Sequence, residues 1–217
     1  MTLYFISGLG ADKRAFSRLK IPPQYKVVHL DWMEPETNES LQAYVKRMAQ
    51  RIDTSEPFAL IGLSFGGIVC TELSSILKPA VTIIISSVTS RKEMPWHFRF
   101  LGRINADRVV NAAAMKKEHF FSHWFFGTKH VHEQELFRTI LRESSPTYVK
   151  WAVHQVLNWQ RVERPANIIH IHGDKDKIFP IQFVKPDIII EGGEHFMVYT
   201  MADEVMERMN EVLSKLN

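Results

Sequence analysis

The sequence predicts a doubly wound α/β fold built on a mostly parallel sheet of six strands. Short apolar runs of strand length recur along the chain, and their continuous Val, Ile and Leu content is typical of parallel strands covered on both faces. Helical segments separate most of these runs, and strand–helix alternation implies right-handed crossovers between parallel strands. The six predicted strands are residues 3–6, 26–30, 58–61, 81–85, 168–171 and 187–190.

The helices are predicted where apolar residues fall on one face. Residues 41–52 show this spacing, and so do residues 200–216, where Thr200 and Asp203 resemble a capping box at the helix start. Between the fourth and fifth strands, residues 87–167 contain no convincing strand. We expect helices there near residues 96–105, 112–126, 133–142 and 146–159, with Pro146 in the first turn of the last one. The chain is therefore expected to form one domain, residues 1–217, with a helical cap inserted at residues 91–162.

Composition and charge narrow the function classes. The 217 residues carry a net charge of +3, and the basic residues are dispersed rather than gathered in the stripe expected for nucleic-acid binding. No apolar run approaches the length of a membrane span, and the first residues lack the pattern of a signal peptide. The single cysteine, Cys70, cannot form an internal disulfide. We expect a soluble, cytoplasmic protein that binds no nucleic acid and has no membrane span, and the oligomeric state stays open.

One motif stands out at the end of the third predicted strand. The residues Gly62-Leu63-Ser64-Phe65-Gly66 follow an apolar run and lead directly into a helix start. A Gly-x-Ser-x-Gly sequence between a strand and a helix is typical of a nucleophile elbow, in which strained backbone exposes the serine hydroxyl. Side chains at Gly62 and Gly66 would collide with the neighbouring strand and helix. The pattern predicts that Ser64 is a nucleophile.

Candidate partners of Ser64 follow the later strands. Asp174 and Asp176 come just after the fifth predicted strand, and His195 follows the sixth, behind two glycines. The carboxyl ends of parallel strands share one edge of the sheet, where ligands bind, so these side chains are expected to meet there. An elbow serine needs a base and an acid that orients it, and the chain order serine, aspartate, histidine fits this requirement. From the residues alone, either aspartate suits the role of the acid.

On these residues the chain resembles the α/β-hydrolase superfamily over nearly its whole length. The family's Gly-x-x-Asp-x-x-x-Pro pattern falls on Gly173 to Pro180 and implies that Asp176 is the acid of a triad with Ser64 and His195. The loop after the first strand begins with Ser7-Gly8 where the family usually has His-Gly. Backbone N–H groups of Leu9 and Phe65 are the expected donors of an oxyanion hole. The helical insertion matches no particular subfamily.

The resemblance implies a serine hydrolase that cleaves a carboxylic ester or thioester through an acyl-enzyme on Ser64, without a metal or organic cofactor. Histidines such as His119 and His123 are interpreted as surface or packing groups rather than as metal ligands. The aromatic content of the cap favours a small-molecule substrate with an apolar part, and the candidate contact residues are Trp96, Phe121, Trp124 and Phe125. Carbon–carbon bond hydrolysis, lyase chemistry, acyl transfer and a non-catalytic ligand receptor stay open, because the fold hosts all of these.

Overall fold

A parallel six-stranded sheet forms the centre of the protein in the computed structural model, which describes residues 1–105, 127–128 and 130–216. The strand order is β2-β1-β3-β4-β5-β6, and every pairing is parallel. The strands are β1 (Thr2–Ile6), β2 (Lys26–His29), β3 (Phe58–Leu63), β4 (Val81–Ile85), β5 (Ile168–Gly173) and β6 (Ile188–Ile190). The predicted strands and their parallel arrangement are confirmed, with boundaries shifted by one or two residues.

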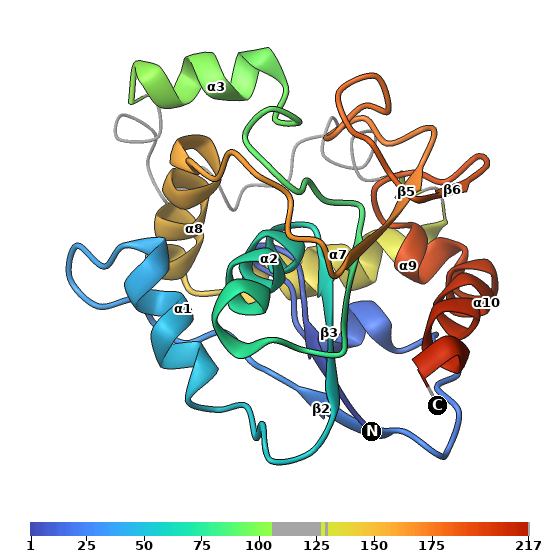
Figure 1. The fold of residues 1–217 in the computed structure, drawn as a ribbon. Helices are drawn as coiled ribbons and strands as arrows, with labels where there is room; N and C mark the ends of the chain where they lie inside the picture. The colour runs from blue at the N-terminus through green and yellow to red at the C-terminus, as the bar shows by residue number, and fades with distance from the viewer. Residues whose placement is uncertain (106–126, 129, 217) are drawn as a thin grey trace.

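Helices cover both faces of the sheet, because successive side chains of a buried strand point to opposite sides. Tyr4 and Ile6 of β1 belong to one core cluster, and Leu3 and Phe5 belong to the other. The first cluster lies under α1 (Leu41–Ala49), α2 (Phe65–Leu77) and α8 (Pro146–Asn158), and the second lies under η1 (Lys13–Phe16), α9 (Met197–Thr200) and α10 (Ala202–Leu213). Figure 1 shows α1 and α2 on one side of the strands and α9 and α10 on the other. The doubly wound fold class is confirmed.

The segment between β4 and β5 contains α3 (Trp96–Arg103), α7 (Val131–Glu143) and α8. These three helices match the predictions for residues 96–105, 133–142 and 146–159, whereas the helix predicted at 112–126 lies outside the described residues. Pro146 occupies the first turn of α8, and the Ser145 side chain caps that turn by accepting a hydrogen bond from the Tyr148 amide at 3.3 Å. Across the described ranges, no helix combines the length and apolar character needed to cross a bilayer.

The end of the chain differs from its prediction. α9 ends at Thr200 and α10 begins at Ala202, followed by the short η2 (Ser214–Leu216). Thr200 therefore terminates one helix instead of capping the next, and its hydroxyl donates to the Phe196 carbonyl at 3.4 Å. Asp203 pairs with Lys20 at 2.8 Å. The predicted capping box is wrong, because Thr200, its expected N-cap residue, lies inside the preceding helix α9.

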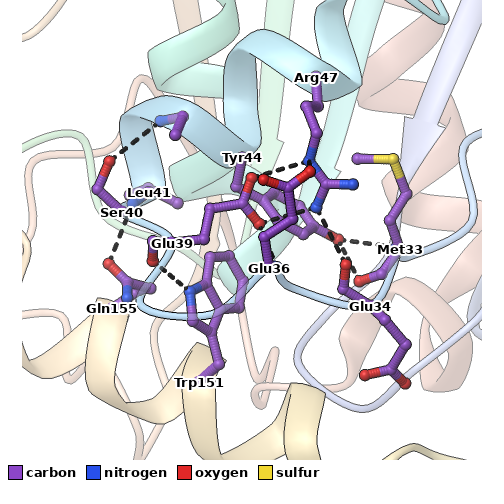
Figure 2. A network of polar contacts seen from close by, with 11 residues as sticks. Met33, Glu34, Glu36, Glu39, Ser40, Leu41, Tyr44, Arg47, Trp151 and Gln155 are labelled. Atoms are coloured by element: carbon purple, nitrogen blue, oxygen red, sulfur yellow. Dashed lines mark hydrogen bonds and ion pairs between the residues drawn. The ribbon is translucent and has the colours of Figure 1, made fainter.

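A polar network fastens α8 to the start of α1 (Figure 2). The Trp151 indole N–H donates to the Glu39 carbonyl at 2.7 Å, and the Gln155 side-chain oxygen accepts from the Leu41 amide at 3.2 Å. The Glu39 carboxylate accepts two hydrogen bonds from Arg47, both at 2.8 Å. These bonds outweigh the effect of burial and lower the pKa of Glu39. The network holds α8 in a fixed position, and α8 forms one wall of the cavity described below.

Candidate active site

Ser64 lies at the point where the strand order reverses. The chain leaves β1 for β2 on one side and continues from β3 to β6 on the other, so the carboxyl ends of β1 and β3 border a natural crevice. Ser64 follows β3 directly, and the loop after β1 passes so close that a Cβ placed on Gly8 would lie 3.5 Å from the Cβ of Ser64. The topology thus brings two loops, predicted separately from the sequence, to one place.

The backbone of Ser64 is strained as an elbow requires. Its φ of 52° and ψ of −117° lie outside the regions that side-chain-bearing residues usually adopt. A Cβ on Gly62 would run into the backbone of Gly66 in α2, and a Cβ on Gly66 would run into the Ile6 carbonyl of β1. The two glycines therefore allow the helix and the strand to approach closely enough to hold Ser64 at the turn.

His195 stands between Ser64 and Asp176. Its Nε2 lies 3.0 Å from the Ser64 Oγ, and its Nδ1 lies 2.8 Å from the Asp176 Oδ2. Both His195 and Asp176 are buried, whereas Ser64 is partly exposed. With Nδ1 donating to the carboxylate, Nε2 carries the lone pair that can accept the serine proton. The structure brings the three side chains into one hydrogen-bonded line, although they come from three distant parts of the chain.

The two rival aspartates have different surroundings. Asp176 Oδ1 accepts hydrogen bonds from the amides of Ile178 and Phe179 at 2.8 and 2.9 Å, which leaves Oδ2 for His195. Burial alone would raise the pKa of Asp176, but the charge and hydrogen bond of His195, together with the neighbouring His172 and the Phe179 amide, hold that pKa below its usual value. Asp174 instead accepts from the Gly192 amide at 2.6 Å and supports the loop that carries His195. The structure thus places Asp176, and not Asp174, against the imidazole.

Two further histidines form a buried row behind Asp176, and sequence analysis assigned them no part in the site. His172 Nε2 lies 2.8 Å from the Phe179 carbonyl and 3.6 Å from the Asp176 Oδ2. His170 Nε2 lies 3.1 Å from the His172 Nδ1. Burial lowers the pKa of both imidazoles, so both are neutral near pH 7. His172 therefore clamps the turn at residues 176–179 that presents the aspartate.

The two predicted oxyanion donors flank Ser64. The Phe65 amide begins α2, where the helix dipole adds positive potential. Neither this N–H nor that of Leu9 has a hydrogen-bond partner in the described part of the chain. The Gly8 carbonyl accepts from the Trp32 indole at 3.1 Å and from the Ala11 amide at 3.0 Å. Because a trans peptide directs its N–H opposite to its C=O, these bonds also fix the direction of the Leu9 N–H.

The residue after β1 shows how the loop is held without the histidine usual in the family. The buried Ser7 hydroxyl donates to the Ala11 carbonyl at 2.6 Å and closes the loop on itself. On the other side of Ser64, the Ser87 hydroxyl donates to the Ser64 carbonyl at 2.7 Å. Trp32 and Ser87 carry no motif in the sequence, and only their positions in space show that they support the site.

A cavity of about 310 Å³ opens onto Ser64 and His195. Its walls are almost entirely apolar, and no Asp, Glu, Lys or Arg side chain lines it among the described residues. Besides the residues already described, the lining includes Phe98, Phe137, Ile140, Leu141, Val149, Val153, Val156, Leu157, Ile178 and Phe179. Of the predicted contact residues, Trp96 is exposed and does not line the cavity, because it lies on the opposite side of α3 from Phe98. Phe121, Trp124 and Phe125 lie outside the described residues.

The model of the alpha/beta hydrolase family matches residues 3–208, and the protein belongs to this family. No curated protein matches the chain. A lipase-esterase related protein from Clostridium acetobutylicum has a similar structure, with a TM-score of 0.71 and 16% identity over 97% of this chain and 93% of that one. A bromoperoxidase from Bacillus anthracis gives a TM-score of 0.74 at 16% identity, with coverage of 98% and 91%. MenH from S. aureus gives 0.73 at 15% identity, with coverage of 100% and 94%. At such identities the likeness extends to the fold alone.

Proposed function

We propose that this protein is a serine hydrolase that cleaves a carboxylic ester or thioester through an acyl-enzyme on Ser64. The observation that carries the proposal is the line from the Ser64 Oγ through His195 to Asp176, with distances of 3.0 and 2.8 Å. This geometry gives a nucleophile, a base and an acid that selects the tautomer of the base. Esterases among the proteins of similar structure, such as one from Exiguobacterium antarcticum, support the same reaction class.

In the first half of the reaction, the Ser64 Oγ attacks the carbonyl carbon while His195 Nε2 takes the hydroxyl proton. The oxyanion that forms accepts hydrogen bonds from the Leu9 and Phe65 amides, each worth about 3 kcal/mol of barrier lowering in measured cases. His195 then returns the proton to the departing alcohol or thiol as the carbon–oxygen or carbon–sulfur bond breaks. Water, activated by the same imidazole, hydrolyses the acyl-enzyme and releases the acid. Asp176 stabilises the imidazolium in both halves.

The cavity supports a neutral, apolar acyl group on a small-molecule substrate. A charged acyl chain would lose its hydration among side chains that offer it no ionic partner. In this proposal, the inserted residues 91–162 form a cap, because α3, α7 and α8 each contribute apolar side chains to the wall above the sheet edge. Each methylene buried in the cavity contributes about 0.8 kcal/mol, which corresponds to roughly a fourfold rise in kcat/KM for each added carbon until the cavity is full.

Labelling with a fluorophosphonate tests the proposal. We expect one adduct per chain, mapped to Ser64 by peptide mass spectrometry, and no adduct in Ser64→Ala or His195→Ala. A p-nitrophenyl ester series from acetate to dodecanoate then measures the dependence on chain length. A correctly folded protein that takes no label and hydrolyses no ester of the series would refute the proposal and would leave a lyase or a non-catalytic receptor as the better explanation.

A further inference from the structure

The outward face of α3 exposes large apolar side chains. Trp96, Phe100 and Ile104 follow one another at intervals of four residues, so they form one stripe along the helix and its last turn. Their exposed fractions are 62%, 54% and 56%. Exposed apolar side chains are common singly, but a continuous stripe of three large ones marks an interaction surface.

The opposite face of α3 fixes this orientation. Phe98 points to the protein interior and lines the cavity beside Ser64. Gly102 is buried, and a Cβ at that position would strike the Leu157 carbonyl of α8. The helix therefore cannot rotate to bury its stripe without opening the cavity wall. In Figure 1, α3 lies at the outer end of the molecule above α8, on the side away from both termini.

Arginines accompany the stripe. Arg99 and Arg103 lie along one flank of it, and neither has an acidic partner in the described part of the chain. Arg91 lies close by, and its guanidinium donates to two backbone carbonyls, those of Leu157 and Trp159. Burial lowers the pKa of Arg91, and the charges of Arg99 and Arg103 lower it further. A partner for this face must therefore accept both apolar side chains and positive charge.

We propose that the outward face of α3 docks on an anionic lipid bilayer, with Trp96, Phe100 and Ile104 at the headgroup boundary and Arg99 and Arg103 on the lipid phosphates. Aromatic and aliphatic side chains beside arginines on one short helix suit this interface. A stable protein–protein interface needs about 800 Å² per partner. An aromatic side chain buries at most about 250 Å². Because Trp96, Phe100 and Ile104 expose 62%, 54% and 56% of their surfaces, the three together offer at most about 430 Å², about half of that area. The docked helix holds the cavity wall at the bilayer, where apolar esters dissolve.

Vesicle co-sedimentation tests this docking surface. We expect the full chain to bind vesicles of phosphatidylcholine with phosphatidylglycerol and to bind pure phosphatidylcholine far more weakly. An arginine near an anionic membrane contributes about fivefold in partition coefficient, so Arg99→Gln with Arg103→Gln should lose about 25-fold. The matched control removes two positive charges at the other end of the molecule, Arg208→Gln with Lys215→Gln, and should lose less than twofold.

The apolar part has its own variants. Trp96→Ser with Phe100→Ser should abolish binding, whereas Val131→Ser, which alters another exposed apolar residue (79% exposed), should not. The surface variants should hydrolyse short esters at the wild-type rate. Ser64→Ala, which should hydrolyse none, should bind vesicles fully, so the result does not depend on the proposed reaction. The proposal would be overturned if the wild-type protein did not co-sediment with anionic vesicles, or if the test and control variants lost vesicle binding equally. A dimer in light scattering that Trp96→Ser dissociates would also overturn it and assign the face to a second copy.

Discussion

Replacing Asp176 by asparagine tests the site most sharply, because the structure decides which way the new amide must point. Oδ1 of Asp176 accepts hydrogen bonds from two backbone amides, that of the half-buried Ile178 and that of the buried Phe179. The asparagine oxygen must keep those bonds, since turning the amide would leave both donors without this acceptor, at a cost of about 1–3 kcal/mol for the buried Phe179 amide alone. In the wild-type protein, His195 Nδ1 donates to the Asp176 Oδ2. In the variant, the asparagine NH2 group must take the place of Oδ2 and face that nitrogen.

This orientation forces the wrong imidazole tautomer. With a donor opposite Nδ1, that nitrogen must accept, and the ring proton moves to Nε2, which faces the Ser64 Oγ at 3.0 Å. The imidazole then has no lone pair for the serine proton, and it also loses the carboxylate that stabilises its charged form. We expect kcat to fall about 10⁴-fold, the loss known for this substitution in serine proteases, which is about 5.4 kcal/mol of barrier.

Steady-state hydrolysis of p-nitrophenyl butyrate measures the effect, with circular dichroism and a thermal melt to confirm folding. The control is Asp174→Asn, in which the side-chain oxygen can still accept from the Gly192 amide. That variant should keep at least a third of the activity. A folded Asp176→Asn enzyme with more than a tenth of the wild-type kcat, or a larger loss in Asp174→Asn, would show that the tautomer argument is wrong.

Three further changes probe the supports of the site. Trp32→Phe removes the indole hydrogen bond that orients the Leu9 peptide. We expect kcat to fall about tenfold at unchanged KM, which is less than the effect of losing one oxyanion donor. An unchanged kcat would contradict this role of Trp32. Gly66→Ala forces a collision with β1 and should lower the melting temperature by about 6 °C or more, from at least ~3 kcal/mol of destabilisation. Arg47→Met removes the ionic partner of the Glu39 carboxylate, whose side chain is 2% exposed, and leaves it the Glu36 amide as a donor. Because the wild-type pKa of Glu39 is lowered, the pair stabilises the fold above pH ~4.5 and loses this effect as the pH falls below it. Urea unfolding should therefore show a loss of about 2 kcal/mol at pH 7 and a smaller loss at pH 3.5, and equal losses would refute the linkage.

The sequence alone predicts the sheet and the elbow, because both depend on local pattern. A buried parallel strand is a continuous apolar run, and all six runs appear as strands in the structure. Gly62 and Gly66 are required by backbone contacts within the motif and with the neighbouring strand β1. The motif itself therefore predicts glycine at both positions. The predicted start of the C-terminal helix at Thr200 is wrong, because Thr200 ends α9 and α10 begins at Ala202. Met197 and Val198 of α9 pack in the core, and this long-range contact is not evident from the local sequence.

The tertiary structure alone decides how the rest of the site is assembled. On the residues alone Asp174 and Asp176 both suit the role of the acid, and only the resemblance to the family favours Asp176. In the structure, the turn at residues 176–179 directs Asp176 to the imidazole. Trp32 and His172 contact the site across folded loops and carry no local signal. The stripe on α3 likewise depends on packing, since Phe98 in the cavity wall and Gly102 against α8 determine which side of the helix stays outside. Sequence pattern specifies what a segment buries, whereas long-range contacts specify which atoms finally meet.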